Sequence, residues 1–373
     1  MTADGSPVVE RPAEIEPQAP KVTILVTTYN KQDFIARTID SALAQTELSL
    51  EVLVVDDAST DETCAVVRSL MQHDRRIRLI ALTRNGRQPA ALNAGIEAAR
   101  GDWVAILDGD DWIAEDHCAG LLELAAEHDA AVVASNMQWV HDDGRPVDGC
   151  RLLGPGETAP MVLDASGFIR RSMPNQVMPL SFLQPMMRRD LLLRHRVRYH
   201  PDDTFDLDFG ILVKAILAGG RLAVSPRPSY FYRQVSGSLM SNRRPDALRR
   251  MKESNDSLLA LCRRYGDARA EALVARRSRA VTREIARAEI AAAVRRRDLV
   301  SVALRSLRAP GDFAALVWRR FRWPLFLLRR RLQALLLRTA GRRASALGAM
   351  AVPVTARVEL ELYWLNGQAL ALL

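Results

Sequence analysis

Three carboxylates fall within four residues at Asp108, Gly109, Asp110 and Asp111. At this spacing the negative charges repel one another unless a cation or hydrogen bonds compensate them. Carboxylate oxygens suit Mg²⁺ or Mn²⁺, which complete their coordination with water and phosphate groups. A solvated turn with Gly109 at positive φ is the structural alternative. The charge density and the position after an apolar segment favour a divalent-metal site.

This acidic segment is one of four polar clusters, each of which follows a short apolar segment typical of a buried strand. The apolar segments are 22–26, 52–55, 78–82 and 103–107. Ligands of an open parallel sheet bind beyond the carboxyl ends of its strands. Four clusters at successive strand ends therefore favour one binding site over isolated turns. The clusters are Thr27 through Asn30, Asp56 and Asp57, Arg84 through Gly86, and Asp108 through Asp111.

Helical patterns separate these strands. Apolar residues recur at helical spacing over 33–45, a second helix ends near residue 72, and Pro89 begins a third as a first-turn proline. This order predicts an α/β fold with a mainly parallel sheet and helices on both faces. Later helices are expected near 164–172, 189–195 and 207–218. A strand near 222–224 is expected to end before Pro226 and Pro228.

The charge distribution divides the 373 residues into two unlike parts. Residues 1–240 carry 24 Lys and Arg against 33 Asp and Glu, whereas residues 241–373 carry 28 against 11, so their net charges are −9 and +17. We expect a disordered leader over 1–20, because it is polar, acidic and rich in proline. An α/β domain over 21–240 and a basic, mainly helical C-terminal region over 241–373 complete the predicted organisation.

The cysteine usage and the lack of long apolar runs predict a cytoplasmic protein. The four cysteines are far apart in sequence, which excludes a Cys-x-x-Cys redox motif and a cysteine-based zinc site. Scattered thiols fit a reducing compartment. The longest apolar runs are interrupted by arginine, so we expect no membrane-spanning helix.

Four ordered segments resemble family 2 of the inverting glycosyltransferases, which have the GT-A fold. They are 22–30, 54–61, 90–96 and 101–111, and the resemblance extends over about residues 21–240. It implies a Rossmann-like catalytic domain that uses Mg²⁺ or Mn²⁺ and transfers a sugar from a nucleotide-sugar donor, UDP-linked by default, with inversion. It also implies a glycan or lipid-linked acceptor and a role in cell-surface polysaccharide biosynthesis.

The resemblance also assigns binding residues. Asp110 and Asp111 would serve the metal, without deciding which carboxylate of residues 108–111 touches it. The donor-binding residues would be Thr27, Tyr29, Asn30, Asp56, Asp57, Arg84, Asn93, Asp108, Asp110 and Arg233. Arg233 lies in a segment similar to the family's Tyr-Arg…Gly-Ser loop, where it could reach a phosphate or be an ordinary surface arginine.

The family places its catalytic base at the start of a helix, usually in a Glu-Asp pair that this chain lacks. Counting back from Gly219 favours Asp208, whereas matching the acidic pattern forwards favours Asp206. We favour Asp208 and keep Asp206 as the alternative. Whichever of the two is the base would accept the proton of the acceptor hydroxyl.

Other functions fit the sequence less well. The first strand lacks the glycine-rich turn that a dinucleotide-binding oxidoreductase needs. The missing glutamate leaves open a catalytically inactive module that binds nucleotide sugars. A basic nucleic-acid-binding protein is disfavoured, because the arginines of the second half are spread along helices.

A leucine stripe follows Pro324 and is flanked by arginines and preceded by aromatic residues. This pattern suits either packing on the catalytic domain or peripheral contact with an anionic membrane at its inner face.

Overall fold

A computed structural model describes residues 8–10, 19–174, 178–201, 207–234, 245–296, 298 and 304. The chain divides into two compact units, 1–240 with 250–278, and 241–249 with 279–373. The leucine stripe after Pro324 lies outside the described residues.

Four parallel strands form the part of the sheet that the apolar segments predict. They are β2 (Val22–Thr28), β3 (Leu50–Asp56), β4 (Ile77–Ala81) and β5 (Trp103–Asp108). They lie in the order β4-β3-β2-β5. Every residue of β2 and β3 is buried, since helices cover both faces.

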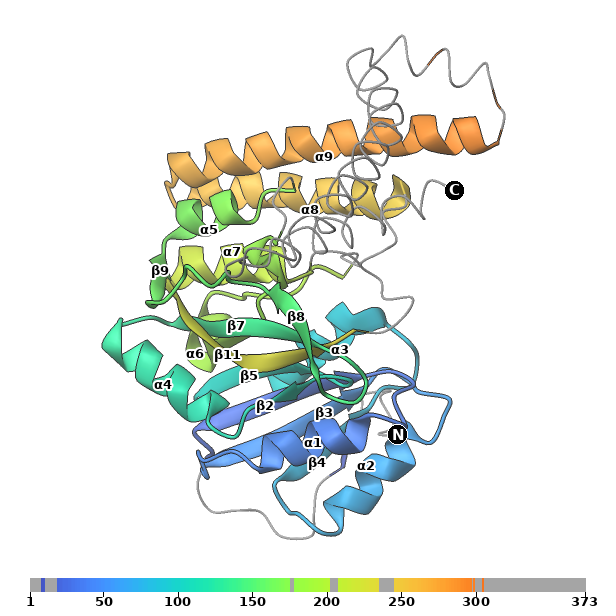
Figure 1. Cartoon of the computed structure of the whole chain (residues 1–373), viewed down its shortest axis with the longest axis vertical. Helices are drawn as coiled ribbons and strands as arrows, with labels where there is room; N and C mark the ends of the chain where they lie inside the picture. The colour runs from blue at the N-terminus through green and yellow to red at the C-terminus, as the bar shows by residue number, and fades with distance from the viewer. Residues whose placement is uncertain are drawn as a thin grey trace, which may run out of the picture. The chain divides into compact units, whose positions relative to one another are not determined.

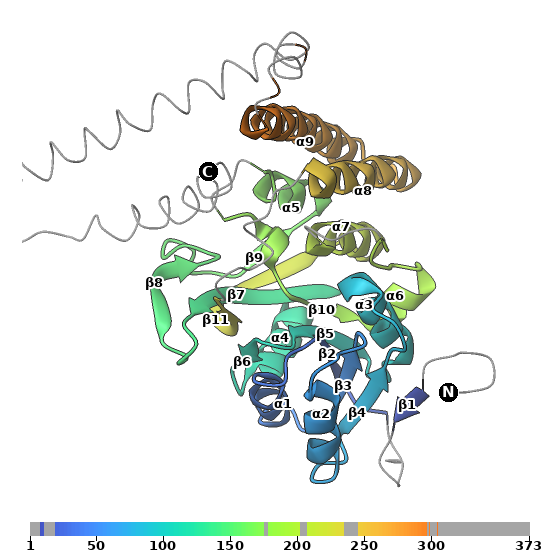
Figure 2. The same cartoon turned by 90° about the vertical axis from the view of Figure 1, so that its right-hand side faces the viewer.

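The helices between these strands cover both faces of the sheet. They are α1 (Ile35–Leu43), α2 (Thr63–Met71) and α3 (Arg87–Ala98). In Figure 2, α1 and α2 lie on one side of the strands, and α3 lies on the other side. Pro89 falls in the first turn of α3, two residues after its start. The α/β order predicted for the first half of the chain is therefore confirmed.

The second half of the sheet is mixed. Its strands are β6 (Trp112–Ile113), β7 (Val132–Val140), β8 (Pro146–Arg151), β9 (Met161–Leu163), β10 (Pro185–Arg188) and β11 (Leu222–Arg233). Strand β10 runs antiparallel between β5 and β7, whereas β11 is parallel to β7. Figure 1 shows β7 and β11 continuing the sheet above β5 and β2. Within the described residues the sheet has eleven strands.

Of the remaining helices, α5, α6 and α7 lie close to the positions predicted near 164–172, 189–195 and 207–218, whereas α4 and η1 were not predicted. They are α4 (His117–Glu127), α5 (Ala165–Arg171), the 3-10 helix η1 (Leu180–Phe182), α6 (Arg189–Arg194), α7 (Leu207–Gly219), α8 (Pro245–Arg264) and α9 (Ala268–Arg295). Helices α8 and α9 confirm that helices follow the α/β part. In the described part of the chain, no helix has both the length and the apolar character needed to cross a bilayer.

The break expected at Pro226 and Pro228 was wrong, because β11 continues through both prolines with two register shifts. On its side away from β7, this strand pairs with β9 only over residues 222–224 and with β6 only at Tyr230 and Phe231. The stretch between these pairings forms an edge, where the missing N–H of proline costs no ladder hydrogen bond.

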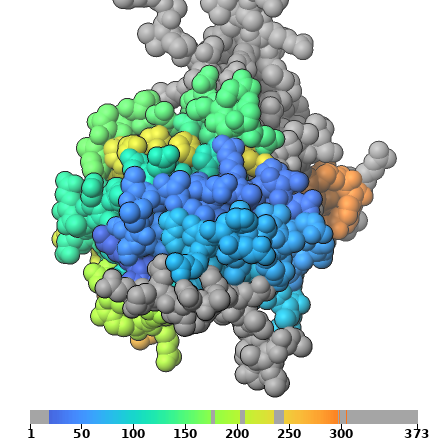
Figure 3. Space-filling view, turned by 90° about the horizontal axis from the view of Figure 1, so that it is seen from below, coloured from blue at the N-terminus to red at the C-terminus, as the bar shows by residue number. Residues whose placement is uncertain are grey.

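The predicted leader contains one strand, β1 (Val8–Glu10), which pairs antiparallel with β4. The β-branched Val8 and Val9 suit this added edge position. Figure 3 shows the molecule from below, where segments of the first half, in blue and cyan, form most of the coloured surface.

Candidate active site

The carboxyl ends of the parallel strands bring the predicted polar clusters together. Thr28 pairs with Asp56 across β2 and β3, and Thr27 pairs with Asp108 across β2 and β5. The N–H of Asp57 donates to the carbonyl of Thr28 at 2.9 Å, which continues the ladder beyond the strands. One edge of the sheet therefore carries residues from three of the clusters side by side.

The three aspartates at this edge have different surroundings. Asp111 is buried, and both of its carboxylate oxygens accept hydrogen bonds within the protein. The hydroxyl of Tyr230 donates to Oδ2 at 2.8 Å, and the backbone N–H of Arg233 donates to Oδ1 at 2.8 Å. Because these bonds join the turn after β5 to β11, Asp111 holds the two parts of the sheet together.

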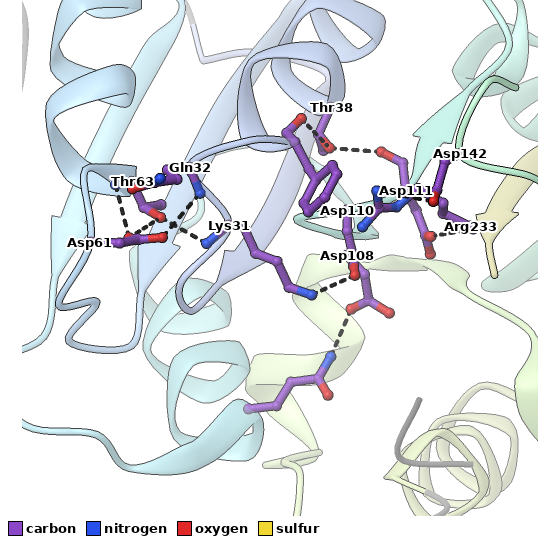
Figure 4. A network of polar contacts seen from close by, with 12 residues as sticks. Lys31, Gln32, Thr38, Asp61, Thr63, Asp108, Asp110, Asp111, Asp142 and Arg233 are labelled. Carbon is purple, nitrogen blue, oxygen red and sulfur yellow. Dashed lines mark hydrogen bonds and ion pairs between the residues drawn. The ribbon is translucent and has the colours of Figure 1, made fainter. Parts of the chain in front are cut away.

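Asp110 is more exposed to solvent than Asp111, with a side chain that is 19% exposed. Its Oδ2 forms an ion pair with Nζ of Lys31 at 2.5 Å, and Figure 4 shows Lys31 reaching across to it from the loop after β2. This pair leaves the Asp110 carboxylate beside solvent, where a metal ion or a phosphate could reach it.

Asp108 has a third environment. Side-chain amides of Gln88, in α3, and Gln184, just before β10, donate to its two oxygens at 2.7 and 3.2 Å. Burial raises the pKa of Asp108 to about 7, and the charge of Asp110 adds to this increase, while Lys31 and Gln88 oppose it. A carboxyl with this pKa is about half protonated at neutral pH, and a bound cation would favour its charged form.

Gly109 is needed for close packing and not for its backbone conformation. It is absent from the residues with positive φ in the described part of the chain, so the turn imagined from the sequence was wrong in this detail. A Cβ added to it would lie 2.9 Å from the carbonyl oxygen of Thr27 and 2.9 Å from Oγ1 of Thr28. Any larger residue would push the acidic segment away from β2.

Asp57 joins the ends of β3 and β4. Its Oδ1 accepts from the N–H of Gly86 at 2.8 Å, and its carbonyl accepts from the side chain of Asn85 at 3.2 Å. Burial raises the pKa of Asp57, although the backbone N–H groups of Gly86 and Arg87 oppose the shift.

Asp56 and Asn30 shape the neighbouring loops. The carboxylate of Asp56 accepts from the N–H and hydroxyl of Ser59 at 2.8 and 2.5 Å. Oδ1 of Asn30 accepts from the N–H of Thr60 at 2.8 Å, and Asn30 itself has a φ of 51°. Tyr29, between these loops, is 44% exposed. An exposed ring at this edge is available to stack on a planar ligand.

Asn93 and Arg84 have very different surroundings. The side-chain amide of Asn93 is bonded at both ends to the backbone of Tyr199, accepting from its N–H and donating to its carbonyl, each at 2.9 Å. Asn93 therefore fixes the segment before α7. Arg84 is exposed in the loop after β4.

Asp208 lies in the first turn of α7, and Asp206 lies outside the described residues. Tyr199 links Asp208 to the acidic edge. The pKa of Tyr199 is raised well above its usual value by burial and then by the charges of Asp208 and Asp108. Its buried hydroxyl has no hydrogen-bond partner among the described residues. Gln184, which donates to Asp108, follows η1, and η1 contacts α7, so the helix that carries Asp208 lies close to the acidic edge.

Arg233 is buried beside this site. Its guanidinium lies over the ring of Phe34 at 3.2 Å and forms an ion pair with Asp142 at 3.3 Å. Figure 4 shows Arg233 on the Asp111 side of the cluster. An ordinary surface arginine, the alternative considered from the sequence, does not describe a side chain that is 5% exposed.

The donor set fits a metal held jointly with a substrate. In the part of the chain that the structure describes, no group of three or more His, Cys, Asp or Glu could hold a metal ion alone. Mg²⁺ commonly takes only one or two protein carboxylates and obtains further oxygens from phosphates and water. Asp110, whose side chain is 19% exposed, could supply one of those carboxylates. Asp108 could supply a second in place of its bonds from Gln88 and Gln184, whereas Asp111 is bound to Tyr230 and the Arg233 N–H of β11.

Five residues of this site were missed from the sequence. They are Lys31, Gln88, Gln184, Tyr199 and Tyr230. Lys31 directly follows the first polar cluster, and Gln88 closely follows the third, so their positions at strand ends could have identified them. Tyr230 begins the segment similar to the family's Tyr-Arg…Gly-Ser loop, whereas Gln184 and Tyr199 come from distant segments that carry no local pattern.

Comparisons with known proteins define the class of this fold and site. Residues 23–176 match the family described as "Glycosyl transferase family 2". Over 270 residues the chain is 36% identical to the succinoglycan biosynthesis protein ExoO of Rhizobium meliloti, covering 70% of this chain and 74% of that protein. It is 28% identical over 261 residues to ExoU of the same organism, covering 69% and 74%. The chain belongs to glycosyltransferase family 2.

A solved structure agrees with the GT-A fold class. TarS 1–349 of S. aureus, crystallised with UDP-GlcNAc, superposes with a TM-score of 0.52 at 23% identity, covering 64% of this chain and 66% of that one. This likeness confirms the α/β fold class, and the family match together with ExoO confirms the assignment as a glycosyltransferase.

Proposed function

We propose that this glycosyltransferase transfers a sugar from a UDP-sugar to a hydroxyl group of a glycan or lipid-linked acceptor, with metal dependence and inversion. The observation that carries the proposal is the arrangement of polar strand ends at one edge of the sheet, where Asp108 accepts from Gln184. Gln184 follows η1, which contacts α7, the helix that carries Asp208. A donor-binding edge and a base on a separate helix would then face one reaction centre, which suits a direct displacement.

The donor would lie along the carboxyl ends of β2, β3 and β5. Tyr29 and Asp57 would bind the base and ribose, together with the loops shaped by Asn30 and Asp56. The diphosphate would lie near Asp110 and Lys31. TarS, which shares the fold, was crystallised with UDP-GlcNAc, and this supports UDP as the first nucleotide to test.

Asp110 and Asp108 would hold Mg²⁺ or Mn²⁺ together with the diphosphate. When bound, the metal supplies Lewis-acid stabilisation of the charge on the departing nucleoside diphosphate. Lys31, which pairs with Asp110 at 2.5 Å, would provide a second positive charge for the same oxygens.

Asp208 would accept the proton of the acceptor hydroxyl as its oxygen attacks the anomeric carbon. The bond between the anomeric carbon and the phosphate oxygen breaks in the same step, and the electron pair leaves with the nucleoside diphosphate. Attack from the face opposite the leaving group inverts the anomeric configuration. Asp206 stays the alternative base, since it lies outside the described residues.

The acceptor and location rest on the relatives. ExoO and ExoU are named for succinoglycan biosynthesis, which supports an extracellular polysaccharide as the product class. We keep residues 21–240 as the catalytic domain and 241–373 as the C-terminal region of the proposal. A cytoplasmic location with contact at the inner face of an anionic membrane stays a prediction, because the leucine and arginine segment after Pro324 is not described.

Turnover of a panel of nucleotide sugars would test the proposal, since slow donor hydrolysis needs no known acceptor. We expect release of nucleoside diphosphate from at least one UDP-sugar in Mn²⁺ or Mg²⁺, and none in EDTA. Donor binding with neither hydrolysis nor transfer to any acceptor offered would instead favour the inactive binding module. No binding of any nucleotide sugar would contradict the proposed donor class.

A further inference from the structure

Arg277, in α9, is the largest of the fully buried side chains, with an exposure of 1%. Taking a guanidinium out of water is costly unless hydrogen bonds and ring contacts offset the loss of hydration. Because this burial is costly and Arg277 lies outside the α/β sheet, its contacts indicate what the side chain does.

Three of the groups that contact the guanidinium are uncharged. Its Nη1 donates to Oδ1 of Asn255, in α8, at 2.5 Å, and its Nε donates to the carbonyl of Ser172 at 3.3 Å. Its central carbon lies 3.5 Å from the centre of the Phe209 ring, a close cation–π contact. These residues belong to one compact unit, which includes 250–278.

Phe209 is held on a second side as well. Its ring stacks on Phe168 of α5 at 5.9 Å between centroids, with an interplanar angle of 22°. Phe209 is 2% exposed and directly follows Asp208 in the first turn of α7. The contacts that fix this ring therefore also fix the helical turn that presents Asp208.

We propose that Arg277 is a positioning residue for Asp208, and that residues 250–278 thereby belong to the catalytic apparatus. The inference rests on the proposed function, with Asp208 as the base. Asp208 must lie within hydrogen-bond reach of the acceptor hydroxyl. A shift of about 1 Å in a reacting group can lower the rate about 100-fold. The Arg277 contact limits such shifts by holding Phe209.

The variant Arg277→Met keeps an apolar side chain of similar length and removes the charge and the hydrogen bonds. We expect kcat to fall about 10- to 100-fold, with the donor KM changed less than about twofold, because the donor edge is built from other elements. Arg276→Met is the matched control, since Arg276 is the exposed neighbour in the same helix. It should behave as the wild type.

A double-mutant cycle separates positioning from general damage. In the Asp208→Asn background, Arg277→Met should cause little further loss, because the group that it positions is already absent. An equal loss in both backgrounds, or a wild-type kcat for Arg277→Met, would overturn the inference. Should Arg277→Met fail to fold, Phe209→Leu removes the ring from the same contact and must show the same split between kcat and KM.

The outcome is distinguishable from a failure of the proposed function. A wild-type protein that turns over no nucleotide sugar, or an Asp208→Asn variant with the wild-type rate, contradicts the proposed function itself. A wild-type rate in Arg277→Met alone, with Asp208→Asn inactive, contradicts only the positioning role.

Discussion

Both edges of the parallel sheet carry buried acidic residues. At the amino edge their negative charge is balanced by hydrogen bonds and cations, whereas at the carboxyl edge it is not fully balanced. At the amino edge, the buried Glu51 accepts from Thr23 at 2.7 Å, from Arg78 at 2.7 Å and from Arg100 at 2.8 Å. At the carboxyl edge, Asp108 and Asp110 share one nearby cation, Lys31. Every oxygen of the first cluster is satisfied, whereas the second carries excess negative charge.

The pKa values show the same difference. Burial would raise the pKa of Glu51, but the hydrogen bond from Thr23 and the charge of Arg78 outweigh it, so the pKa is lowered. Burial raises the pKa of Asp108 to about 7. A satisfied charge network stabilises a fold, while an unbalanced one at a cleft edge marks a candidate functional site.

The largest expected effect concerns Asp208, the proposed base. Asp208→Asn removes the proton acceptor while keeping the side-chain size, so transfer should fall about 100- to 10,000-fold with donor affinity retained. Asp190→Asn is the matched control, because Asp190 is an exposed acid in the first turn of α6. Steady-state transfer assays and donor titrations would measure both. If instead Asp206→Asn alone is inactive, the base is Asp206.

Breaking the amino edge should affect stability and spare catalysis. Arg78→Met leaves Glu51 buried with one cation fewer, which typically costs about 3–5 kcal/mol of unfolding free energy. Urea unfolding would measure this, with Arg76→Met as control, since the Arg76–Asp74 pair is partly exposed and is expected to contribute less than about 1 kcal/mol. A changed donor KM in folded Arg78→Met would show that the two edges are not independent.

Two neighbouring acids at the carboxyl edge should also differ in their effects: Asp111 on stability and Asp110 on donor binding. Asp111→Ala loses the bonds from Tyr230 and Arg233, so the protein should lose about 2–3 kcal/mol of unfolding free energy. Asp110→Ala should change stability by less than about 1 kcal/mol and abolish metal-dependent donor binding. Denaturant unfolding gives the unfolding free energy of each variant, and donor titration gives its donor affinity. Loss of donor binding by a folded Asp111→Ala with retention by Asp110→Ala would reverse the assignment.

The smallest expected effect is a pH dependence of stability in EDTA. The pKa of Asp108 rises from 3.8 to about 7 on folding, so the folded protein binds its proton more tightly. The stability that this carboxyl contributes is present below pH 3.8 and is lost as the pH rises through about 7.

Between pH 5 and pH 8 the wild type should therefore lose about 2 kcal/mol more unfolding free energy than Asp108→Asn. Asp74→Asn is the control. Burial would raise the pKa of Asp74, but Arg76 lowers it overall, so its effect lies below pH 5. If the unfolding free energies of the wild type and Asp108→Asn change equally between pH 5 and pH 8, the raised pKa is contradicted.

The sequence predicted the strands and the strand-end clusters because each depends on a local pattern. Segments such as 22–26 are apolar throughout, as a strand buried on both faces must be. The parallel order then places their carboxyl ends together. The passage of β11 through Pro226 could not be predicted in this way, because it depends on which strands lie on the outer side of β11.

The distinct states of the aspartates were also beyond prediction. Asp110 and Asp111 are neighbours with the same chemistry, and both were assigned to the metal. Their difference comes from Tyr230, Arg233 and Lys31, which lie in distant parts of the sequence. Burial and partners of this kind are set by tertiary contacts, so a motif identifies the cluster but not the role of each acid.

The most direct test of the account is UDP binding by calorimetry, in Mn²⁺ and in EDTA, with one variant at each edge. Arg100→Met alters the amino edge but leaves Arg78 on Glu51. Asp110→Asn alters the carboxyl edge. We predict that the wild type and Arg100→Met bind UDP with equal affinity in Mn²⁺ and lose that affinity in EDTA. Asp110→Asn should bind in Mn²⁺ no better than the wild type does in EDTA. Wild-type affinity of Asp110→Asn for UDP in Mn²⁺ would contradict the account.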